Sequence, residues 1–248
     1  MKERLDNLLV RRGLAPSRER AKAYIMEGVV FVNGEREDKP GSFFEEDRIR
    51  SLEVRSDPIP YVSRGGLKLA HAIENWQIDV SGATCLDIGA STGGFTDCLL
   101  QNGAVRVYSV DSGTNQLDWK LRSDPRVVCM EKTNFRYLTK EDIPELIDFA
   151  CADVSFISLE KVLPPACALL RDGAQMVCLV KPQFEAGREL VGKNGIVRDP
   201  AVHAAVLERI AAFCETIGFD CLGHTDSPIL GAKGNKEFLL WIRKGEKG

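Results

Sequence analysis

From Thr84 onward the chain alternates short, continuously apolar runs with longer stretches of helical periodicity. Continuous apolar runs are typical of strands buried on both faces, so this alternation predicts an α/β fold with a mostly parallel sheet and helices on both faces. Helices are expected near residues 95–101, 159–170 and 201–217. The strand candidates are CLDI, VRVYSV, VVCM, IDFACADV, QMVCLV, a run near residues 219–222, and FLLWI. In such a fold, a ligand site is expected at the carboxyl ends of the strands.

The first 55 residues follow a different pattern. Leucines at helical spacing predict a first helix that stops at Gly13, and a second helix is expected from Ser17, its N-cap, to Gly28. Residues 29–32 read as a strand, and Asn33-Gly34 is a strong hairpin turn because both residues tolerate positive φ. The sequence therefore predicts a small N-terminal α+β domain over residues 1–55, a linker over residues 56–62 that contains two prolines, and a second domain over residues 63–248.

Charge is distributed unevenly along the chain. The formal net charge of -3 gives no general attraction for nucleic acid, but residues 1–24 carry seven basic and three acidic side chains. This local excess fits either a nucleic-acid surface or a solvated helix face.

Membrane, disulfide and metal sites are not expected. No apolar run approaches the roughly 20 residues of a membrane span, and the polar start MKERLDNLL lacks the apolar core of a signal peptide. The eight cysteines never form C-x-x-C and read as reduced core residues. His71, His203 and His224 are far apart in sequence, so no metal is predicted. These features predict a cytoplasmic protein without membrane insertion.

A glycine-rich turn follows the strand candidate CLDI directly and leads into a helix. The turn, Gly89-Ala90-Ser91-Thr92-Gly93-Gly94-Phe95, can bring bare backbone close to a ligand at a helix N-terminus. Asp111 closes the next strand, where a carboxylate can accept hydrogen bonds from ribose hydroxyls. Ser91 stands where the dehydrogenase fingerprint G-x-G-x-x-G requires glycine, so we expect a nucleotide-like ligand bound by another plan.

Two lysines and two carboxylates lie at or near the expected strand ends. Asp153 closes the fourth strand, Lys181 the fifth, and Glu237 opens the last, while Lys68 begins a helix before the first strand. Gathered in one cleft, these groups could shift each other's pKa values and favour a lysine that holds or accepts a proton.

The motif Asp87-x-Gly89 followed by Gly93-Gly94 resembles the first motif of methyltransferases that bind S-adenosylmethionine. The resemblance implies a Rossmann-like domain whose glycines pass under the methionine part of the cofactor and whose Asp111 holds the adenosine ribose. The cofactor-binding residues it implies are Asp87, Gly89, Ala90, Ser91, Gly93, Gly94, Phe95 and Asp111. Asp87 could instead be a strand-end residue that satisfies nearby backbone donors.

The N-terminal pattern R-L-D-x-x-L, G-L-A-x-S-R, I-x-x-G-x-V-x-V-N-G resembles an S-four-like RNA-binding domain, named after the fourth small-subunit ribosomal protein. In that family the second helix and the turn before it face RNA. The resemblance implies RNA-binding residues Arg4, Arg11, Arg12, Arg18, Arg20 and Lys22. Arg4 and Arg18 could instead form structural ion pairs.

Lys68, Asp153, Lys181 and Glu237 resemble the Lys-Asp-Lys-Glu tetrad of FtsJ-like ribose methyltransferases. Together with the S-four-like domain and the runs YVSRGGLKL, ADVSFISL, KPQFE and GNKEFLLW, the whole chain resembles the TlyA family of rRNA 2'-O-methyltransferases, which have also been labelled hemolysins. This implies that Lys181 orients or deprotonates a ribose 2'-hydroxyl while the other three set charge and position. The implied partner is ribosomal RNA or a ribosomal subunit; the target nucleotide and the oligomeric state stay open.

Other functions fit the sequence less well. Methylation of base amino groups is disfavoured because Asp153 is not followed by Pro-Pro and an aromatic, and carbon methylation because no Pro-Cys dipeptide occurs. A membrane-lytic hemolysin would need an amphipathic or insertable segment, and none is found. A non-catalytic RNA-binding ribosome-assembly factor remains an alternative. Phe156 could stack on a target base or cap the core, and residues 185–198 could face RNA or simply connect two elements.

Overall fold

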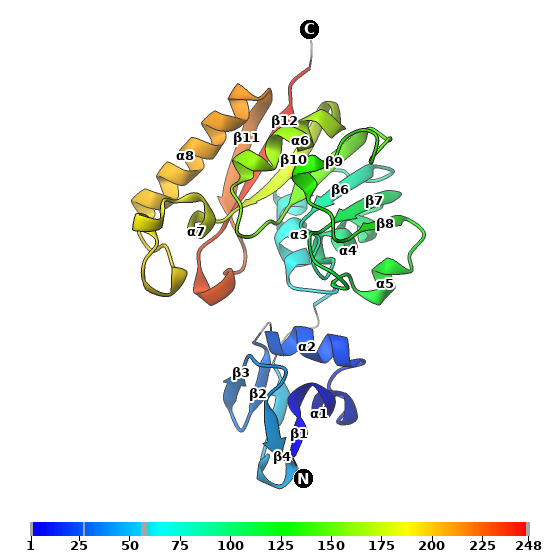
Figure 1. The fold of residues 1–248 in the computed structure, drawn as a ribbon, viewed down its shortest axis with the longest axis vertical. Helices are drawn as coiled ribbons and strands as arrows, with labels where there is room; N and C mark the ends of the chain where they lie inside the picture. The colour runs from blue at the N-terminus through cyan, green and yellow to red at the C-terminus, as the bar shows by residue number, and fades with distance from the viewer. Residues whose placement is uncertain (1, 27, 56–58, 247–248) are drawn as a thin grey trace. The chain divides into compact units, whose positions relative to one another are not determined.

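The computed structural model describes residues 2–26, 28–55 and 59–246, and the chain divides into two compact units, residues 1–64 and 65–248 (Figure 1). The predicted linker, residues 56–62, falls in part on residues 56–58, which lie outside the described residues.

The described residues of the N-terminal unit form two α-helices, one 3-10 helix and five short strands. In chain order the elements are β1 (Lys2–Arg4), α1 (Leu5–Arg11), α2 (Arg18–Met26), β2 (Val30–Val32), β3 (Glu35–Glu37), β4 (Phe43–Glu45), the 3-10 helix η1 (Glu46–Arg48) and β5 (Leu52–Val54). Strands β1 and β4 form an antiparallel pair, and β3-β2-β5 form an antiparallel sheet. Ser17 caps α2, since its Oγ accepts a hydrogen bond from Arg20 N at 3.2 Å. Asn33 and Gly34 have φ of 53° and 86°, as the predicted hairpin turn requires.

The second unit alternates strands and helices along the chain. Its elements are α3 (Gly65–Trp76), β6 (Thr84–Ile88), α4 (Gly94–Gln101), β7 (Arg106–Val110), α5 (Trp119–Arg122), β8 (Val127–Met130), η2 (Phe135–Tyr137), β9 (Ile147–Ala152), η3 (Leu159–Lys161), α6 (Leu163–Leu169), β10 (Leu170–Val180), α7 (Pro182–Glu185), η4 (Arg188–Leu190), η5 (Lys193–Gly195), α8 (Pro200–Thr216), β11 (Phe219–Asp226), η6 (Ala232–Gly234) and β12 (Phe238–Lys244).

The seven strands of this unit form one sheet in the order β11-β12-β10-β9-β6-β7-β8. All neighbouring pairs are parallel except those that involve β12, which runs antiparallel between β10 and β11. Helices α6 and α8 pack on the face that carries Leu86 and Ile88, and α3 and α4 lie on the other face (Figure 1). The predicted mostly parallel α/β sheet with helices on both faces is confirmed.

The central strands are buried on both faces, which explains their unbroken apolar sequences. In β10, Met176, Cys178 and Val180 belong to the core under α6 and α8, and the intervening Val177 and Leu179 are buried as well. All eight cysteines are free thiols, and five of them are buried. None of the helices in the described ranges has both the length and the apolar character that a membrane crossing requires.

Candidate active site

Four charged side chains meet at one edge of the seven-stranded sheet. Asp153 follows β9, Lys181 follows β10 and Glu237 precedes β12. Strands β9 and β10 are parallel neighbours and β12 runs antiparallel beside β10, so the ends of the first two and the start of the third lie at the same edge. Lys68 comes from the first turn of α3, which begins at Gly65 rather than at the lysine as the sequence suggested.

The four groups are in direct contact. Lys68 Nζ lies 2.8 Å from Glu237 Oε2 and 3.6 Å from Asp153 Oδ2. Lys181 Nζ lies 2.5 Å from Asp153 Oδ1. The Glu237 side chain is 3% exposed and that of Asp153, the most accessible of the four, is 21% exposed. The structure therefore brings all four predicted residues into one network of two cations and two anions that is largely shielded from water.

The two lysines control the ionisation of Asp153. Burial alone would raise the pKa of this carboxyl, but the charges of Lys68 and Lys181 and their hydrogen bonds outweigh burial and lower the pKa. Asp153 is therefore an anion at neutral pH, held between two ammonium groups. Removing one partner from such a network leaves a shielded charge without its counterion, which costs far more than breaking a surface pair.

Three residues that the sequence analysis missed surround this network. Ser155 Oγ accepts a hydrogen bond from Lys181 Nζ at 2.9 Å, and Gln183 Nε2 lies 3.4 Å from Glu237 Oε1. A Cβ atom at Gly231 would overlap the Glu237 carboxylate, so the glycine provides the space for that side chain. The proximity of Ser155 to Asp153 in sequence could have pointed to it, whereas Gly231 carries no local signal.

A cavity of about 650 Å³ opens beside the network, within the size range of small-molecule sites. Its lining includes Asp153 together with three of the predicted cofactor residues, Gly89, Ser91 and Asp111. The lining residues that the sequence analysis missed include Gly113, Gln116, Thr133, Asn134, Phe135 and Val154. These follow β7, β8 and β9, so the carboxyl ends of neighbouring parallel strands build the cavity.

Glycine is required at two positions of the turn after β6. Gly89 has φ of 85°, and a Cβ there would lie 2.6 Å from the carbonyl oxygen of Asp153, so the missing side chain lets the turn approach the segment after β9. Gly93 has φ of 95°, and a Cβ there would overlap Leu121 of α5. The missing side chain of Gly93 therefore lets Leu121 of α5 pack against the turn.

The other three predicted turn residues do not line the cavity. Ala90, Gly94 and Phe95 are buried in the protein beside it. Their contact with a cofactor stays a prediction.

Asp87 lies fully buried one residue before the end of β6. Its Oδ2 accepts a hydrogen bond from Thr96 Oγ1 at 2.7 Å, and Thr96 Oγ1 lies 2.7 Å from Ser109 Oγ. Within the described residues its Oδ1 has no hydrogen-bond partner. Burial raises the pKa of Asp87 to about 7, against the opposing effect of the Thr96 hydrogen bonds. The Asp87 side chain is therefore buried, and backbone N–H donors do not bond both of its carboxyl oxygens.

Asp111 and Glu131 hold the loop that forms one wall of the cavity. Asp111 accepts hydrogen bonds from Ser91 N at 2.8 Å and Gly113 N at 2.7 Å. Glu131, at the end of β8, accepts from three consecutive amides, those of residues 115–117, and from Arg122 Nη2 at 2.7 Å. The Arg122 hydrogen bond is the main cause that lowers the pKa of Glu131 to about 2. Sequence reasoning did not identify Glu131.

The predicted RNA-binding arginines of the N-terminal unit mostly pair with acids. Arg4 and Arg18 both contact Asp6, at 2.9 Å and 3.1 Å. Arg11 and Arg12 contact the exposed Glu46, at 2.7 Å and 3.7 Å. Arg4 and Arg18 therefore form ion pairs, which is the alternative role considered for them. RNA binding stays a prediction for all four arginines.

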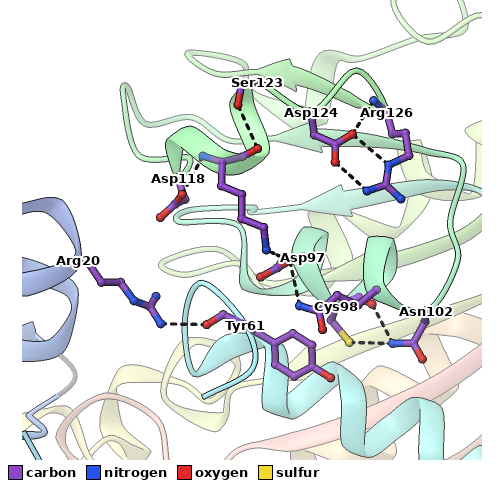
Figure 2. Close-up of polar contacts among 11 residues, drawn as sticks. Arg20, Tyr61, Asp97, Cys98, Asn102, Asp118, Ser123, Asp124 and Arg126 are labelled. Atoms are coloured by element: carbon purple, nitrogen blue, oxygen red, sulfur yellow. Dashed lines mark hydrogen bonds and ion pairs between the residues drawn. The ribbon is translucent and has the colours of Figure 1, made fainter. Parts of the chain in front are cut away.

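Arg20 and Lys22 lie on α2, the helix that begins with Arg18. Arg20 Nη2 donates to the carbonyl oxygen of Tyr61 at 3.1 Å (Figure 2). Its guanidinium carbon lies 4.9 Å from the ring centroid of Tyr24. Their contact with RNA also stays a prediction.

Phe156 projects into solvent rather than into the core. Its side chain is 89% exposed, its φ is 63°, and its ring centroid lies 4.9 Å from that of Phe184. The alternative in which Phe156 caps the core is therefore wrong. It lines both the large cavity and a second hollow of about 490 Å³ bounded by Arg188 and Val191.

The segment of residues 185–198 includes the short 3-10 helices η4 and η5 and is anchored at both ends. Glu185 accepts hydrogen bonds from Ser158 Oγ and Leu159 N, both at 2.7 Å. The buried Asn235 bonds Gly195 O and Val197 N, at 3.0 Å and 3.1 Å.

Comparison with known proteins identifies families and relatives that this chain resembles. Residues 61–244 match the family described as FtsJ-like methyltransferase, and residues 3–47 match the S4 domain. The chain is 55% identical to "Putative rRNA methyltransferase YqxC" of Bacillus subtilis, over 100% of this chain and 89% of that protein. It is 44% identical to the 16S/23S rRNA (cytidine-2'-O)-methyltransferase TlyA of Mycobacterium tuberculosis, over 97% of this chain and 89% of that protein. The solved structure "Putative hemolysin from Streptococcus thermophilus" is 51% identical and superposes with a TM-score of 0.79, over 99% of this chain and 90% of that one.

Proposed function

The chain belongs to the FtsJ-like methyltransferase family, and we propose that it transfers a methyl group from S-adenosylmethionine to a ribose 2'-hydroxyl of ribosomal RNA. The observation that carries the proposal is the contact network of Lys68, Asp153, Lys181 and Glu237 beside a cavity of suitable size. We place the reaction in the cytoplasm, on ribosomal RNA or a ribosomal subunit.

The cavity suits the chemistry of S-adenosylmethionine. This cofactor carries a cationic sulfonium and an ammonium group, and it supplies the methyl group when bound. Asp111 and Asp153 line the cavity, and the buried Asp87 beneath the turn has an oxygen without a partner in the described part of the chain. The carboxylates of Asp111 and Asp153 in this partly shielded cavity favour a cationic ligand. Asp111 would hold the ribose hydroxyls, and Gly89 and Ser91 would contact the methionine part.

Lys181 carries the reaction in this proposal. It would orient the 2'-hydroxyl, or would release one proton to water and then accept the hydroxyl proton, as the ribose oxygen takes the methyl group that S-adenosylmethionine would supply and the thioether product leaves. Asp153 and Ser155 fix the direction of the Lys181 ammonium group. Lys68 and Glu237 hold Asp153 in place and balance its charge. Alignment of the two reacting atoms contributes on the order of 7 to 11 kcal/mol, and general-base help adds about a hundredfold to ten-thousandfold in rate.

The exposed Phe156 and the half-buried Phe184 supply a surface for the nucleotide that carries the reacting ribose. A ribose within a helix cannot enter a cavity unless its nucleotide leaves the stack, and an aromatic ring can then replace the lost stacking. Phe156 lines the large cavity together with Asp153 and also lines the second hollow, so a base on its face would place the attached ribose near Lys181.

The test is methyl transfer from labelled S-adenosylmethionine to purified ribosomal subunits. We expect Lys181→Ala to reduce transfer at least about a hundredfold, because it removes both orientation and proton transfer. Lys161→Ala, which changes an exposed lysine of η3, is the matched control and should retain wild-type transfer. RNA binding should be retained by both variants.

Two outcomes would contradict the proposal. Equal transfer by the Lys181 variant would remove this residue from the mechanism. RNA binding by the wild-type chain without any transfer of label, across ribosomal subunits at different stages of assembly, would favour the non-catalytic ribosome-assembly role.

A further inference from the structure

Asp6 is a fully buried carboxylate in α1 that holds two of the predicted RNA-binding arginines. Its Oδ1 accepts from Arg4 Nε at 3.0 Å and from its neighbour's amide, Asn7 N, at 3.0 Å. Its Oδ2 accepts from Arg4 Nη2 at 2.9 Å and from Arg18 Nε at 3.1 Å. The hydrogen bond from Arg4 is the main cause that lowers the pKa of Asp6 to about 2, so the carboxylate stays ionised.

The neighbouring ion pairs of this unit are built differently. Arg11 pairs with Glu46, whose side chain is 44% exposed, and with Glu3, whose side chain is 22% exposed. Pairs between exposed groups contribute little and open readily, because water replaces the lost partner. Asp6 is 0% exposed, and opening its pairs would leave a buried charge alone. Arg4 and Arg18 are therefore held in place, whereas Arg11 is free to change partner.

We infer that Asp6 is a positioning residue that fixes the guanidinium groups of Arg4 and Arg18 as a preformed site for one RNA backbone phosphate. The inference rests on the proposed function and assigns to Asp6 a role that is additional to it.

The donors left over by Asp6 fit this role. Asp6 engages one edge of the Arg4 guanidinium, its Nε and Nη2, and only Nε of Arg18. Among the described residues, neither the Nη1 group of Arg4 nor the two Nη groups of Arg18 bond another acceptor, and the two side chains are 34% and 47% exposed. Planar guanidinium groups bind phosphate oxygens through paired N–H groups, and a fixed orientation lowers the entropy lost on binding.

Charge and geometry predict opposite effects for removal of Asp6. The three side chains carry a net charge of +1, and replacing the carboxylate by a neutral amide raises it to +2. If only charge mattered, RNA would bind more tightly. If Asp6 positions the arginines, RNA will bind more weakly despite the added positive charge.

The first experiment compares Arg18→Lys with Arg11→Lys in binding of the full-length protein to purified ribosomal RNA. Both variants keep their positive charge and lose the planar guanidinium. We expect Arg18→Lys to weaken binding about tenfold and Arg11→Lys to change it less than about twofold, because only Arg18 is held in a fixed orientation. Equal affinities for the two variants would overturn the inference.

The second experiment compares Asp6→Asn with Glu46→Gln. Asp6→Asn should weaken RNA binding, while Glu46→Gln, which removes an exposed acid paired with Arg11, should leave binding unchanged or slightly tighter. Thermal unfolding followed by far-UV circular dichroism shows whether each variant is folded. If Asp6→Asn is unfolded, the RNA affinities of Arg18→Lys and Arg11→Lys decide whether Asp6 positions the arginines. Tighter binding by folded Asp6→Asn would refute a positioning role.

Methyl transfer separates this inference from the proposed function. A phosphate site that only binds RNA affects the KM for RNA, so Arg18→Lys should raise this KM and retain kcat at saturating RNA. A wild-type protein that neither binds nor methylates ribosomal RNA would overturn both proposals. A wild-type protein that does both, with unchanged KM in Arg18→Lys, would overturn only the role of Asp6.

Discussion

Replacing Asp87 by asparagine should change how the stability of the second unit depends on pH. Burial raises the pKa of Asp87 from an ordinary value of 3.8 to about 7 in the folded protein. Between these values the folded chain holds one more proton than the unfolded chain, so this residue makes stability fall as pH rises from about 4 to about 7. The difference between the two pKa values corresponds to about 4 kcal/mol. Asparagine has a similar shape and does not titrate.

The assay is urea unfolding followed by tryptophan fluorescence. All three tryptophans, at positions 76, 119 and 241, belong to the unit formed by residues 65–248, so the signal reports the unit that contains Asp87. Measured at each pH, the free energy of unfolding of Asp87→Asn minus that of the wild type should rise by about 4 kcal/mol between pH 4 and pH 7, then level off.

The matched control is Asp124→Asn. A hydrogen bond from Arg126 is the main cause that lowers the pKa of Asp124, so its contribution is present above its ordinary pKa and is lost only as pH falls below it (Figure 2). Its stability difference from the wild type should be flat between pH 5 and pH 7. A flat difference for Asp87→Asn as well would refute the claim that this carboxyl is protonated near neutral pH.

Further variants test the walls of the site. Gly231→Ala should displace the Glu237 carboxylate and reduce methyl transfer about tenfold or more, while binding of S-adenosylmethionine in equilibrium dialysis stays near that of the wild type. Glu131→Gln removes the charged acceptor of residues 115–117, and it should weaken cofactor binding about tenfold in the same dialysis. Ser155→Ala removes one hydrogen bond from Lys181 and should lower kcat about fivefold to tenfold, with the KM for cofactor unchanged.

Much of the second unit could be predicted because its strands carry their own signal. Each expected apolar run became part of a strand, such as VVCM at β8 and FLLWI within β12, although β10 and β11 extend beyond their runs. In the central strands the signal is strong because residues buried on both faces are apolar. The strands β1 and β4 of the N-terminal unit were not predicted. Their sequences, KER and FFE, are only three residues long and lack the alternation of apolar and polar residues that marks a half-buried strand.

The candidate site was predictable where residues stand at strand ends. Asp153, Lys181 and Glu237 each adjoin a strand, so the sheet order brings them together. The Asp6–Arg18 and Glu131–Arg122 contacts join different elements of the chain. A local sequence pattern does not predict such contacts. For the same reason the sequence could not choose between the two roles considered for Arg18.

The position of the transferred methyl group tests the central claim most directly. Ribosomal RNA labelled by the full-length protein and tritiated S-adenosylmethionine would be hydrolysed completely with alkali. A methylated 2'-oxygen cannot attack the neighbouring phosphodiester, so ribose methylation predicts that the label appears in alkali-stable dinucleotides. Label recovered in mononucleotides would place the methyl group on a base and contradict the role given to Lys181 and its three partners.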